Sequence, residues 1–565
     1  MAPHTSASLL AAITTWMISG SRASIQRPGL LPTPPMGFND WSRFECAINQ
    51  SVFTETADAM VSKGLLTAGY NRINIDDCWM ADARTEEGKL TWNETLFPNG
   101  LPWLGEYLQD RGFHFGIYED AGNETCGGYP GSYGYEEVDA HTFASWGIDY
   151  LKVDGCHVTP STEDEYHKRY AAWHKAFSKM SDPLIFSQSA PAYFSLWLTG
   201  SDNLTDWFTV MDWVPYNGEL ARHSSDILVY VGVEGLSGWE SVMQNYNYNT
   251  QVARYQVPGY FNDPDFLIAD NPELSLDEKR SQFALWASFS APLIISAWIP
   301  SLPDEVVSYL KNSDLIEIDQ DPLAQQATLV SRDDSFDVLT RSLANGDRVV
   351  TVLNRGNSTD DISISALRLG LLNTKRTYSA KNLWTGEFIR FQGSLEIRGL
   401  ASHATAVFRI NLSGPSSFGV SPTGMIFNAA STKCLTAGSK SEEVEFTTCA
   451  ATDAQVWQIR PLLSTISPLS APSLCLTATA GKVLLEDCEL LKFTQEWEYS
   501  VSGYLTNKHT HECMTEMAGA SLSECQYEVD SQLWLHIVIG NYLIYAYFLD
   551  IPLSLYATER NGVEI

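Results

Sequence analysis

Basic residues are scarce in this sequence of 565 residues, which has 36 Lys and Arg against 68 Asp and Glu and a formal charge of −32 at pH 7. Nucleic acids and anionic membranes attract basic surfaces, so this balance argues against both as partners. It suits a protein that binds neutral ligands, and it is compatible with a protein that works in an acidic medium. With 44% apolar and 18% charged residues the chain is globular, and its length predicts two to four domains.

Metal-binding and phosphate-binding patterns are also missing. The 11 histidines form no His-x-x-x-His or His-Glu-x-x-His pair, so we expect no metal and no cofactor. No Cys-x-x-Cys pair occurs, which argues against a zinc ribbon and a thioredoxin-type site. No Gly-x-Gly-x-x-Gly follows the first predicted strand, which disfavours a dinucleotide-binding open sheet.

The ten cysteines are even in number and fall into five pairs of close neighbours. This arrangement predicts five disulfides formed in an oxidising compartment. The expected pairs are Cys46 and Cys78, Cys126 and Cys156, Cys434 and Cys449, Cys475 and Cys488, and Cys513 and Cys525.

Further features indicate a secreted, extracellular protein. Residues 1–23 combine apolar runs with the small-residue cleavage site Ser21-Arg-Ala23, as in a secretory signal peptide. The tail at 539–565 is unassigned; it is apolar, but Asp550 and Pro552 interrupt it before 18 apolar residues accumulate, so no membrane anchor is expected. The predicted glycosylation sites are the six Asn-x-Ser/Thr sequons at Asn49, Asn93, Asn123, Asn203, Asn357 and Asn411.

Residues 24–327 alternate short apolar runs with helical patterns, which predicts a (β/α)8 TIM barrel. A doubly wound open sheet is the alternative. The candidate strands are Met36–Asn39, Tyr70–Asp76, Phe113–Tyr118, Tyr150–Asp154, Leu184–Ser187, Ile227–Val231, Gly259–Phe261 and Leu293–Ser296. The candidate helices, spaced by 3.6 residues, are Ala57–Leu66, Leu101–Arg111, Glu165–Lys179 and Leu276–Ser290.

The pattern changes after the barrel. Residues 328–413 contain short alternating runs without a long helix, which predicts a small antiparallel β-sandwich, and 414–424 is a linker. Residues 425–538 contain three units of about 40 residues, each with a Cys-x-Thr start and a Gln-x-Trp end. This repeat resembles the ricin-type β-trefoil lectins.

The aspartate that holds sugar in that lectin family is replaced here by threonine in every repeat, at Thr436, Thr477 and Thr515. A threonine cannot offer the charge-assisted, bidentate acceptor that an aspartate offers a vicinal diol. We therefore expect weak carbohydrate binding by the trefoil, or a purely structural domain.

The run Asp149-Tyr-Leu-Lys-Val-Asp154-Gly-Cys156 carries the clearest chemical signal. It is a β-branched strand that ends on a carboxylate, with Lys152 two residues upstream. Side chains at the C-terminal ends of barrel strands point into the active-site mouth. A carboxylate held ionised there by a cation can act as a nucleophile, although a lone aspartate at a strand end is more often a turn or cap.

Other predicted strands supply matching groups. They lead into Phe38-Asn-Asp-Trp41, Asn74-Ile-Asp-Asp-Cys-Trp79, Tyr118-Glu-Asp-Ala-Gly122, Lys152–Cys156 and Asn262-Asp-Pro-Asp265. Over residues 32–413 the chain resembles the family 27 glycoside hydrolases, the retaining α-galactosidases and α-N-acetylgalactosaminidases, with a trefoil appended in the fungal style.

This resemblance implies roles for the residues at matching positions. Asp154 would be the nucleophile, and Lys152 would keep it charged and contact the sugar. Asp76 and Asp77 would accept hydrogen bonds from O4 and O6, while Trp41 and Tyr118 would wall the ring. The Cys126–Cys156 disulfide would lie beside the nucleophile, and Cys46–Cys78 would clamp the first two strand ends.

The acid/base carboxylate is assigned by the same resemblance to Asp226, with Arg222 as its partner at O2. The next tryptophan, Trp239, lies thirteen residues on, which implies an insertion. Asp212 and Glu234 are rival candidates. A retaining mechanism needs the acid/base to have a raised pKa and the nucleophile to stay ionised.

The loop Phe186–Tyr193 would face the sugar's C2 group, with Ser189, Ala192 and Tyr193 as contacts. α-Galactosidases of the animal type have Glu and Leu at the positions of Ser189 and Ala192, whereas the N-acetylgalactosaminidases have Ser and Ala as here. Gln188 replaces a family cysteine. The implied partners are α-galactoside oligosaccharides or polysaccharides, with N-acetylgalactosamine as an additional or preferred sugar. A non-catalytic galactose-binding lectin is the remaining alternative.

Overall fold

The computed structural model describes residues 29–195, 204–228, 236–412, 421–460, 463–500, 502–517, 519–526 and 530–535. Several predictions from the sequence therefore lie outside the described residues. They are the signal peptide at 1–23, the sequon at Asn203, the rival carboxylate Glu234, most of the linker at 414–424, and the tail at 539–565. In the part of the chain that is described, no helix is long and apolar enough to cross a membrane.

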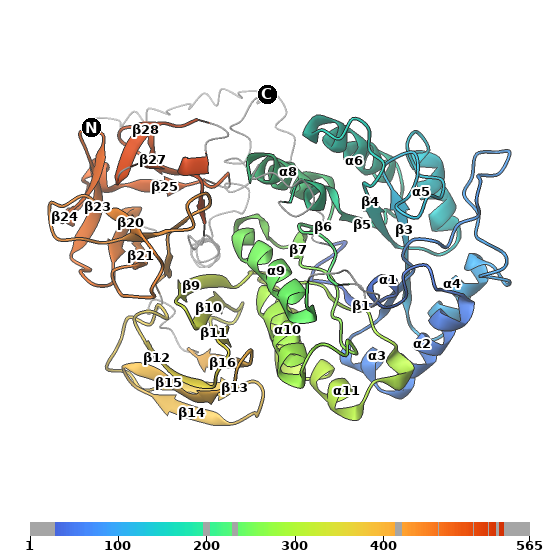
Figure 1. The fold of residues 1–565 in the computed structure, drawn as a ribbon, viewed down its shortest axis with the longest axis horizontal. Coiled ribbons are helices and arrows are strands. Elements are labelled where there is room, and N and C mark those ends of the chain that lie inside the picture. Colours follow the sequence, from blue (N-terminus) through green and yellow to red (C-terminus); the bar gives the residue numbers. More distant parts are fainter. Residues whose placement is uncertain are drawn as a thin grey trace, which may run out of the picture.

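The N-terminal part is a barrel of parallel strands surrounded by helices (Figure 1). Its strands are β1 (Met36–Asn39), β2 (Arg72–Asn74), β3 (His114–Asp120), β4 (Tyr150–Asp154), β5 (Ile185–Gln188), β6 (Leu220–Arg222), β7 (Phe261–Asp263) and β8 (Leu293–Ile295). They are hydrogen-bonded in the order β7-β6-β5-β4-β3-β2-β1-β8. The parallel bridge between Leu267 and Ile295 joins the segment after β7 to β8 and closes the ring. This confirms the predicted barrel over the open sheet.

Helices cover the outside of the barrel. They are α1 (Trp41–Phe44), α2 (Gln50–Ser62), α3 (Leu65–Ala68), α4 (Leu101–Gln109), α5 (Glu136–Ser145), α6 (Glu163–Phe177), α8 (Leu204–Asn217), α9 (Gly238–Gln251), α10 (Leu276–Phe289), α11 (Asp304–Leu310) and α12 (Ser313–Asp319). The helix predicted over Ala57–Leu66 is split in two, because Gly64 adopts φ +75°. Helix α5 was not predicted, since its apolar residues do not gather on one face.

The sixth strand is the main correction to the sequence-based prediction. It is β6, Leu220–Arg222, and not Ile227–Val231. A three-residue strand that ends on arginine gives almost no apolar run, so hydrophobicity favoured the later segment. Ile227 and Leu228 are buried beside the mouth of the barrel instead, and 229–231 lie outside the described residues.

The second part is an antiparallel sandwich, which confirms that prediction. Its strands are β9 (Thr328–Arg332), β10 (Phe336–Ser342), β11 (Arg348–Asn354), β12 (Asp360–Ser365), β13 (Tyr378–Asn382), β14 (Phe388–Phe391), β15 (Ser394–Leu400) and β16 (Thr405–Asn411). A six-stranded sheet, β14-β13-β16-β11-β10-β9, packs with the pair β12-β15 around a separate apolar core. His403 links the sandwich to the barrel, because it stacks on Trp239 of α9 and contacts Glu278 of α10.

The third part has the threefold pattern of a β-trefoil. Its strands are β17 (Thr423–Met425), β18 (Phe427–Asn428), β19 (Cys434–Thr436), β20 (Glu445–Thr447), β21 (Val456–Arg460), β22 (Thr465–Pro468), β23 (Leu474–Thr479), β24 (Lys482–Asp487), β25 (Trp497–Tyr499), β26 (Leu505–Asn507), β27 (Glu512–Glu516), β28 (Ala520–Glu524) and β29 (Trp534–Leu535). The tryptophans of the three Gln-x-Trp motifs, Trp457, Trp497 and Trp534, are buried. Each indole N–H donates to the carbonyl that follows the first cysteine of its repeat.

The ten cysteines form five disulfides, each between the neighbours expected from the sequence. Of the predicted glycosylation sites, Asn49, Asn123, Asn357 and Asn411 are exposed and Asn93 is half-buried.

Candidate active site

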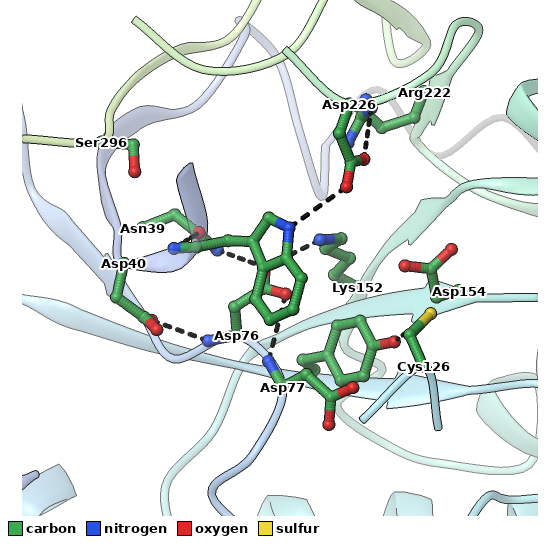
Figure 2. Close-up of polar contacts among 12 residues, drawn as sticks. Asn39, Asp40, Asp76, Asp77, Cys126, Lys152, Asp154, Arg222, Asp226 and Ser296 are labelled. Carbon is green, nitrogen blue, oxygen red and sulfur yellow. Dashed lines mark hydrogen bonds and ion pairs between the residues drawn. The ribbon is translucent and has the colours of Figure 1, made fainter. Parts of the chain in front are cut away.

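A cavity of about 510 Å³ opens at the C-terminal ends of the barrel strands. Nine of the eleven predicted site residues line it, and they come from strands and loops spread over the first 226 residues. They are Trp41, Asp76, Tyr118, Asp154, Ser189, Ala192, Tyr193, Arg222 and Asp226. The Cys126–Cys156 disulfide also lines it. Figure 2 shows the carboxylates of Asp76, Asp154 and Asp226 arranged around Lys152.

Asp154 lies at the end of β4 and is held by two donors. Tyr193 donates its phenolic hydroxyl to Asp154 Oδ1, and the Gly155 amide donates to the same oxygen at 3.1 Å. Burial raises the pKa of Asp154, while the charge of Lys152 and the bond from Tyr193 offset part of the rise. The carboxylate is therefore oriented by a phenol and an amide, with a cation nearby.

Lys152 makes a different contact from the one expected. Its Nζ donates to Asp76 Oδ2 at 2.7 Å, and no hydrogen bond between Lys152 and Asp154 is formed in the described structure. Asn39 donates to the same Asp76 oxygen at 2.8 Å. Asp76 is thus fixed by a charged and an amide donor, and Lys152 acts on Asp154 only through its charge.

Asp77 does not line the cavity in this structure. Its Oδ1 accepts from the Cys78 amide at 2.6 Å and its Oδ2 from the Gly127 amide at 2.7 Å. The carboxylate therefore ties the loop of the Cys126–Cys156 disulfide to the end of β2.

Asp226 follows β6, two strands from β4 in the barrel, and lies with Asp154 at the cavity (Figure 2). Its side chain is 52% exposed, and it accepts from Arg222 Nη2 at 3.0 Å and from Trp41 Nε1 at 3.1 Å. Burial acts to raise the pKa of Asp226, but Arg222, Lys152 and Trp41 lower it below its usual value. This direction is opposite to the one expected for an acid/base carboxylate.

The rival Asp212 does not line the cavity. It lies in α8 and accepts from the Tyr255 hydroxyl at 2.8 Å. Glu234 lies outside the described residues.

The loop after β5 forms the short 3-10 helix Ala190–Phe194 at the cavity wall. Ser189 and Ala192 line the cavity, and the buried Ser189 Oγ has no hydrogen-bond partner among the described residues. Gln188, which takes the place of the family's cysteine, does not line the cavity. Its side-chain amide donates a hydrogen bond to the Val214 carbonyl at 2.9 Å.

Two buried carboxylates near the cavity belong to strand-end motifs of the sequence, but the sequence alone assigned them no function. Asp120, at the end of β3, accepts from the Gly122 and Cys156 amides at 2.6 and 2.8 Å. Burial and the nearby Asp154 raise the pKa of Asp120 to about 8. Asp265 follows β7 and contacts Arg222 at 3.1 Å. Their position in strand-end motifs was the only signal for them in the sequence.

Asp120, Asp154 and the sulfurs of Cys126 and Cys156 lie within 4.8 Å of one another. Both sulfurs belong to a disulfide, so they offer no thiolate to a metal ion.

Three protein families match consecutive parts of the chain. The family described as "Alpha galactosidase A" matches residues 33–321. "Alpha galactosidase C-terminal beta sandwich domain" matches 333–410, and "Ricin-type beta-trefoil lectin domain" matches 422–534.

Similar proteins cover nearly the whole chain. Alpha-galactosidase A of Aspergillus niger is 57% identical over 93% of this chain and 94% of its own length. An alpha-galactosidase of Cyamopsis tetragonoloba is 37% identical over 64% of this chain and 82% of its own. A solved α-galactosidase of Saccharomyces cerevisiae superposes with a TM-score of 0.61 at 25% identity, covering 69% of this chain and all of that one. The chain therefore belongs to the α-galactosidase A family of glycoside hydrolases and carries the β-sandwich and the ricin-type trefoil in addition to the barrel.

Proposed function

We propose that this protein is a retaining exo-glycosidase that hydrolyses terminal, non-reducing α-linked D-galactose from oligosaccharides and polysaccharides. The observation that carries the proposal is one cavity that brings together Asp154, at the end of β4, and Asp226, after β6, beside Trp41 and Tyr118. Aromatic walls and fixed carboxylates suit a sugar, whose ring has an apolar face and hydroxyl groups at its edge.

In the proposed mechanism, Asp154 attacks the anomeric carbon and forms a carbon–oxygen bond while the glycosidic bond breaks. Asp226 gives its proton to the leaving oxygen. Water then attacks the same carbon, Asp226 takes a proton from the water, and the Asp154 carboxylate leaves. Tyr193 and Gly155 orient the nucleophile, and Lys152 balances its charge.

The low pKa of Asp226 in the free protein requires a change when substrate binds. A bound sugar excludes water from the half-exposed carboxylate and accepts a hydrogen bond from Arg222 at O2. Both changes destabilise the ionised form, so they raise the pKa of Asp226 toward the range that a general acid needs.

The C2 pocket supports N-acetylgalactosamine as an additional or preferred sugar. Ser189 and Ala192 are small, and the unpartnered Ser189 hydroxyl is available to the substituent at C2. A glutamate and a leucine at these positions would fill that space and add an acceptor for a 2-hydroxyl.

The test compares p-nitrophenyl α-galactoside and p-nitrophenyl α-N-acetylgalactosaminide as substrates of the wild type, Asp154→Ala and the double variant Ser189→Glu/Ala192→Leu. We expect hydrolysis of at least one substrate, a loss of more than about 1000-fold in Asp154→Ala, and a shift of the double variant toward the galactoside. Full activity of Asp154→Ala on either substrate would show that the nucleophile is wrong. An unchanged substrate ratio in the double variant would refute the C2 assignment.

The trefoil contributes carbohydrate binding that we propose is weak. In each repeat the glutamine of Gln-x-Trp donates to the threonine that replaces the aspartate, namely Thr436, Thr477 and Thr515. Each threonine hydroxyl donates in turn to the carbonyl of the cysteine two residues before it. These groups are satisfied internally, so little is offered to a sugar. Retention of the Asp154→Ala variant on immobilised galactose that is lost when Thr436, Thr477 and Thr515 are also replaced by Ala would contradict this.

We also propose that the chain is secreted. The disulfides and the predicted signal peptide support this, and N-terminal sequencing of protein from the culture medium tests it.

A further inference from the structure

One guanidinium nitrogen bridges the predicted acid/base and a second, buried carboxylate. Arg222 Nη2 lies 3.0 Å from Asp226 Oδ1 and 3.1 Å from Asp265 Oδ2. The Asp265 side chain is 2% exposed, whereas that of Asp226 is 52% exposed. The cation that neutralises Asp226 is therefore shared with a carboxylate that the solvent does not reach.

Asp265 also holds the main chain next to the acid/base. Its Oδ2 accepts a hydrogen bond at 2.7 Å from the main-chain amide of Ile227, which is the residue after Asp226. Asp265 adopts φ +76°, and this conformation is fixed by Asp263, which accepts from the Asp265 amide at 2.8 Å, and by Trp286, which donates to the Asp265 carbonyl at 2.6 Å. Asp265 is thus built rigidly into the turn after β7.

The charges around this pair are unequal in number. The cations are Arg222 and Lys152, and the carboxylates are Asp76, Asp154, Asp226, Asp263 and Asp265. Burial raises the pKa of Asp265 to about 7; Arg222 lowers it and Asp226 raises it. Two carboxylates that repel each other across one nitrogen titrate as a pair, and the pair keeps one proton to higher pH than either carboxylate alone beside Arg222.

We propose that Asp265 is a positioning residue for acid/base catalysis: it shares Arg222 with Asp226 and holds the Ile227 amide, and so keeps one proton on the Asp226–Asp265 pair to higher pH and Asp226 aimed at the leaving oxygen. Without Asp265, Arg222 would neutralise Asp226 alone and favour its ionised form. This inference rests on the proposed role of Asp226.

The test is the pH dependence of kcat/KM for Asp265→Asn, an uncharged side chain of the same shape that tolerates positive φ. We expect the alkaline limb to move to lower pH by about one unit or more, which is about tenfold in rate at a fixed pH on that limb. The loss of kcat/KM should be larger on an alkyl α-galactoside than on the p-nitrophenyl substrate. A poor leaving group depends more strongly on protonation by the general acid. An unchanged limb and an unchanged ratio between the two substrates would overturn the proposal.

Controls separate this proposal from the proposed function. Asp270→Asn removes another Arg–Asp pair after β7, that of Arg43 and Asp270 at 3.1 Å, and should leave the pH profile unchanged. If Asp226→Asn keeps its activity on the alkyl substrate, Asp226 is not the acid, whatever Asp265→Asn does. If Asp265→Asn does not fold, Asp265→Gly, which fits the same φ without strain, must show the same shift.

Discussion

At the scale of single residues, the pKa of Asp154, the proposed nucleophile, is set by neighbours that act in opposite directions. Burial raises the pKa of Asp154, and the repulsion from Asp226 adds to the rise. Lys152 and the hydroxyl of Tyr193 act in the other direction. This balance decides at which pH Asp154 becomes ionised, and Tyr193 takes part in it through a direct side-chain hydrogen bond.

Replacing Tyr193 by Phe removes that hydrogen bond and keeps the ring. The pKa of Asp154 should rise, because the bond stabilises the charged form, so the acid limb of kcat/KM moves to higher pH. We expect kcat/KM to fall by about 10- to 100-fold, in line with a hydrogen bond to a charged group. Initial rates from pH 3 to 8 measure both effects.

Tyr166→Phe is the matched control. Tyr166 packs 5.5 Å from Tyr193 between ring centroids, but its hydroxyl donates to the Gly155 carbonyl and not to a carboxylate. It should leave the acid limb in place. An acid limb that stays put in Tyr193→Phe as well would contradict the role of the phenol.

At the scale of elements, the start of α10 joins the barrel to the sandwich. Ser275 accepts from the Glu278 amide at 3.2 Å, and Glu278 Oε2 accepts from the Ser275 amide at 2.7 Å, which forms a capping box. The other oxygen of Glu278 contacts His403 of the sandwich at 2.7 Å. One short motif therefore both starts the helix and orients the contact between two parts of the molecule.

Ser275→Ala should lower the free energy of unfolding by about 1 kcal/mol, because an orphan helix amide loses its acceptor. Calorimetry or thermal unfolding by circular dichroism measures the loss, and the kinetic constants should not change. Ser178→Ala is the control: Ser178 is an exposed residue at the end of α6 whose hydroxyl donates to the Lys175 carbonyl, so the loss in free energy of unfolding should stay within about 0.5 kcal/mol. Equal losses in both variants would contradict the capping argument.

At the scale of the whole molecule, the excess of acidic residues reaches the interior. Glu119 is fully buried, and neither of its oxygens has a hydrogen-bond partner among the described residues. Arg84 lies 3.9 Å from it but binds Asp139 through two shorter contacts, at 2.6 and 2.7 Å. Burial and the nearby Asp139 raise the pKa of Glu119 well above its usual value, and burial raises that of Asp139 to about 6.

These raised values predict that acid stabilises the protein. A carboxyl with a higher pKa in the folded state binds more protons there than in the unfolded state, so stability falls as pH rises through the interval between the two values. The melting temperature should be highest near pH 4 to 5 and lower by several degrees at pH 8. Self-repulsion from the formal charge of −32 acts in the same direction.

Glu119→Gln isolates one group in this balance. It should raise the melting temperature at pH 8 and change it little at pH 4, because the amide resembles the protonated carboxyl. Glu106→Gln, at an exposed position of α4, should run parallel to the wild type. A Glu119→Gln curve that also runs parallel would mean that Glu119 is not protonated in the folded protein.

Local patterns in the sequence were sufficient for the barrel, the sandwich, the five cysteine pairs and the three Gln-x-Trp repeats. Each depends on periodicity or on neighbours along the chain, and the residue types at strand ends indicated the chemistry of the cavity. The tertiary structure decided which groups meet there. Lys152 pairs with Asp76, 76 residues away, and Arg222 is divided between Asp226 and Asp265. The strand β6 could also be recognised only in the folded barrel, where three residues are enough to form a strand between its neighbours. Such pairings depend on the register of strands that lie far apart in the sequence, and no local pattern encodes that register.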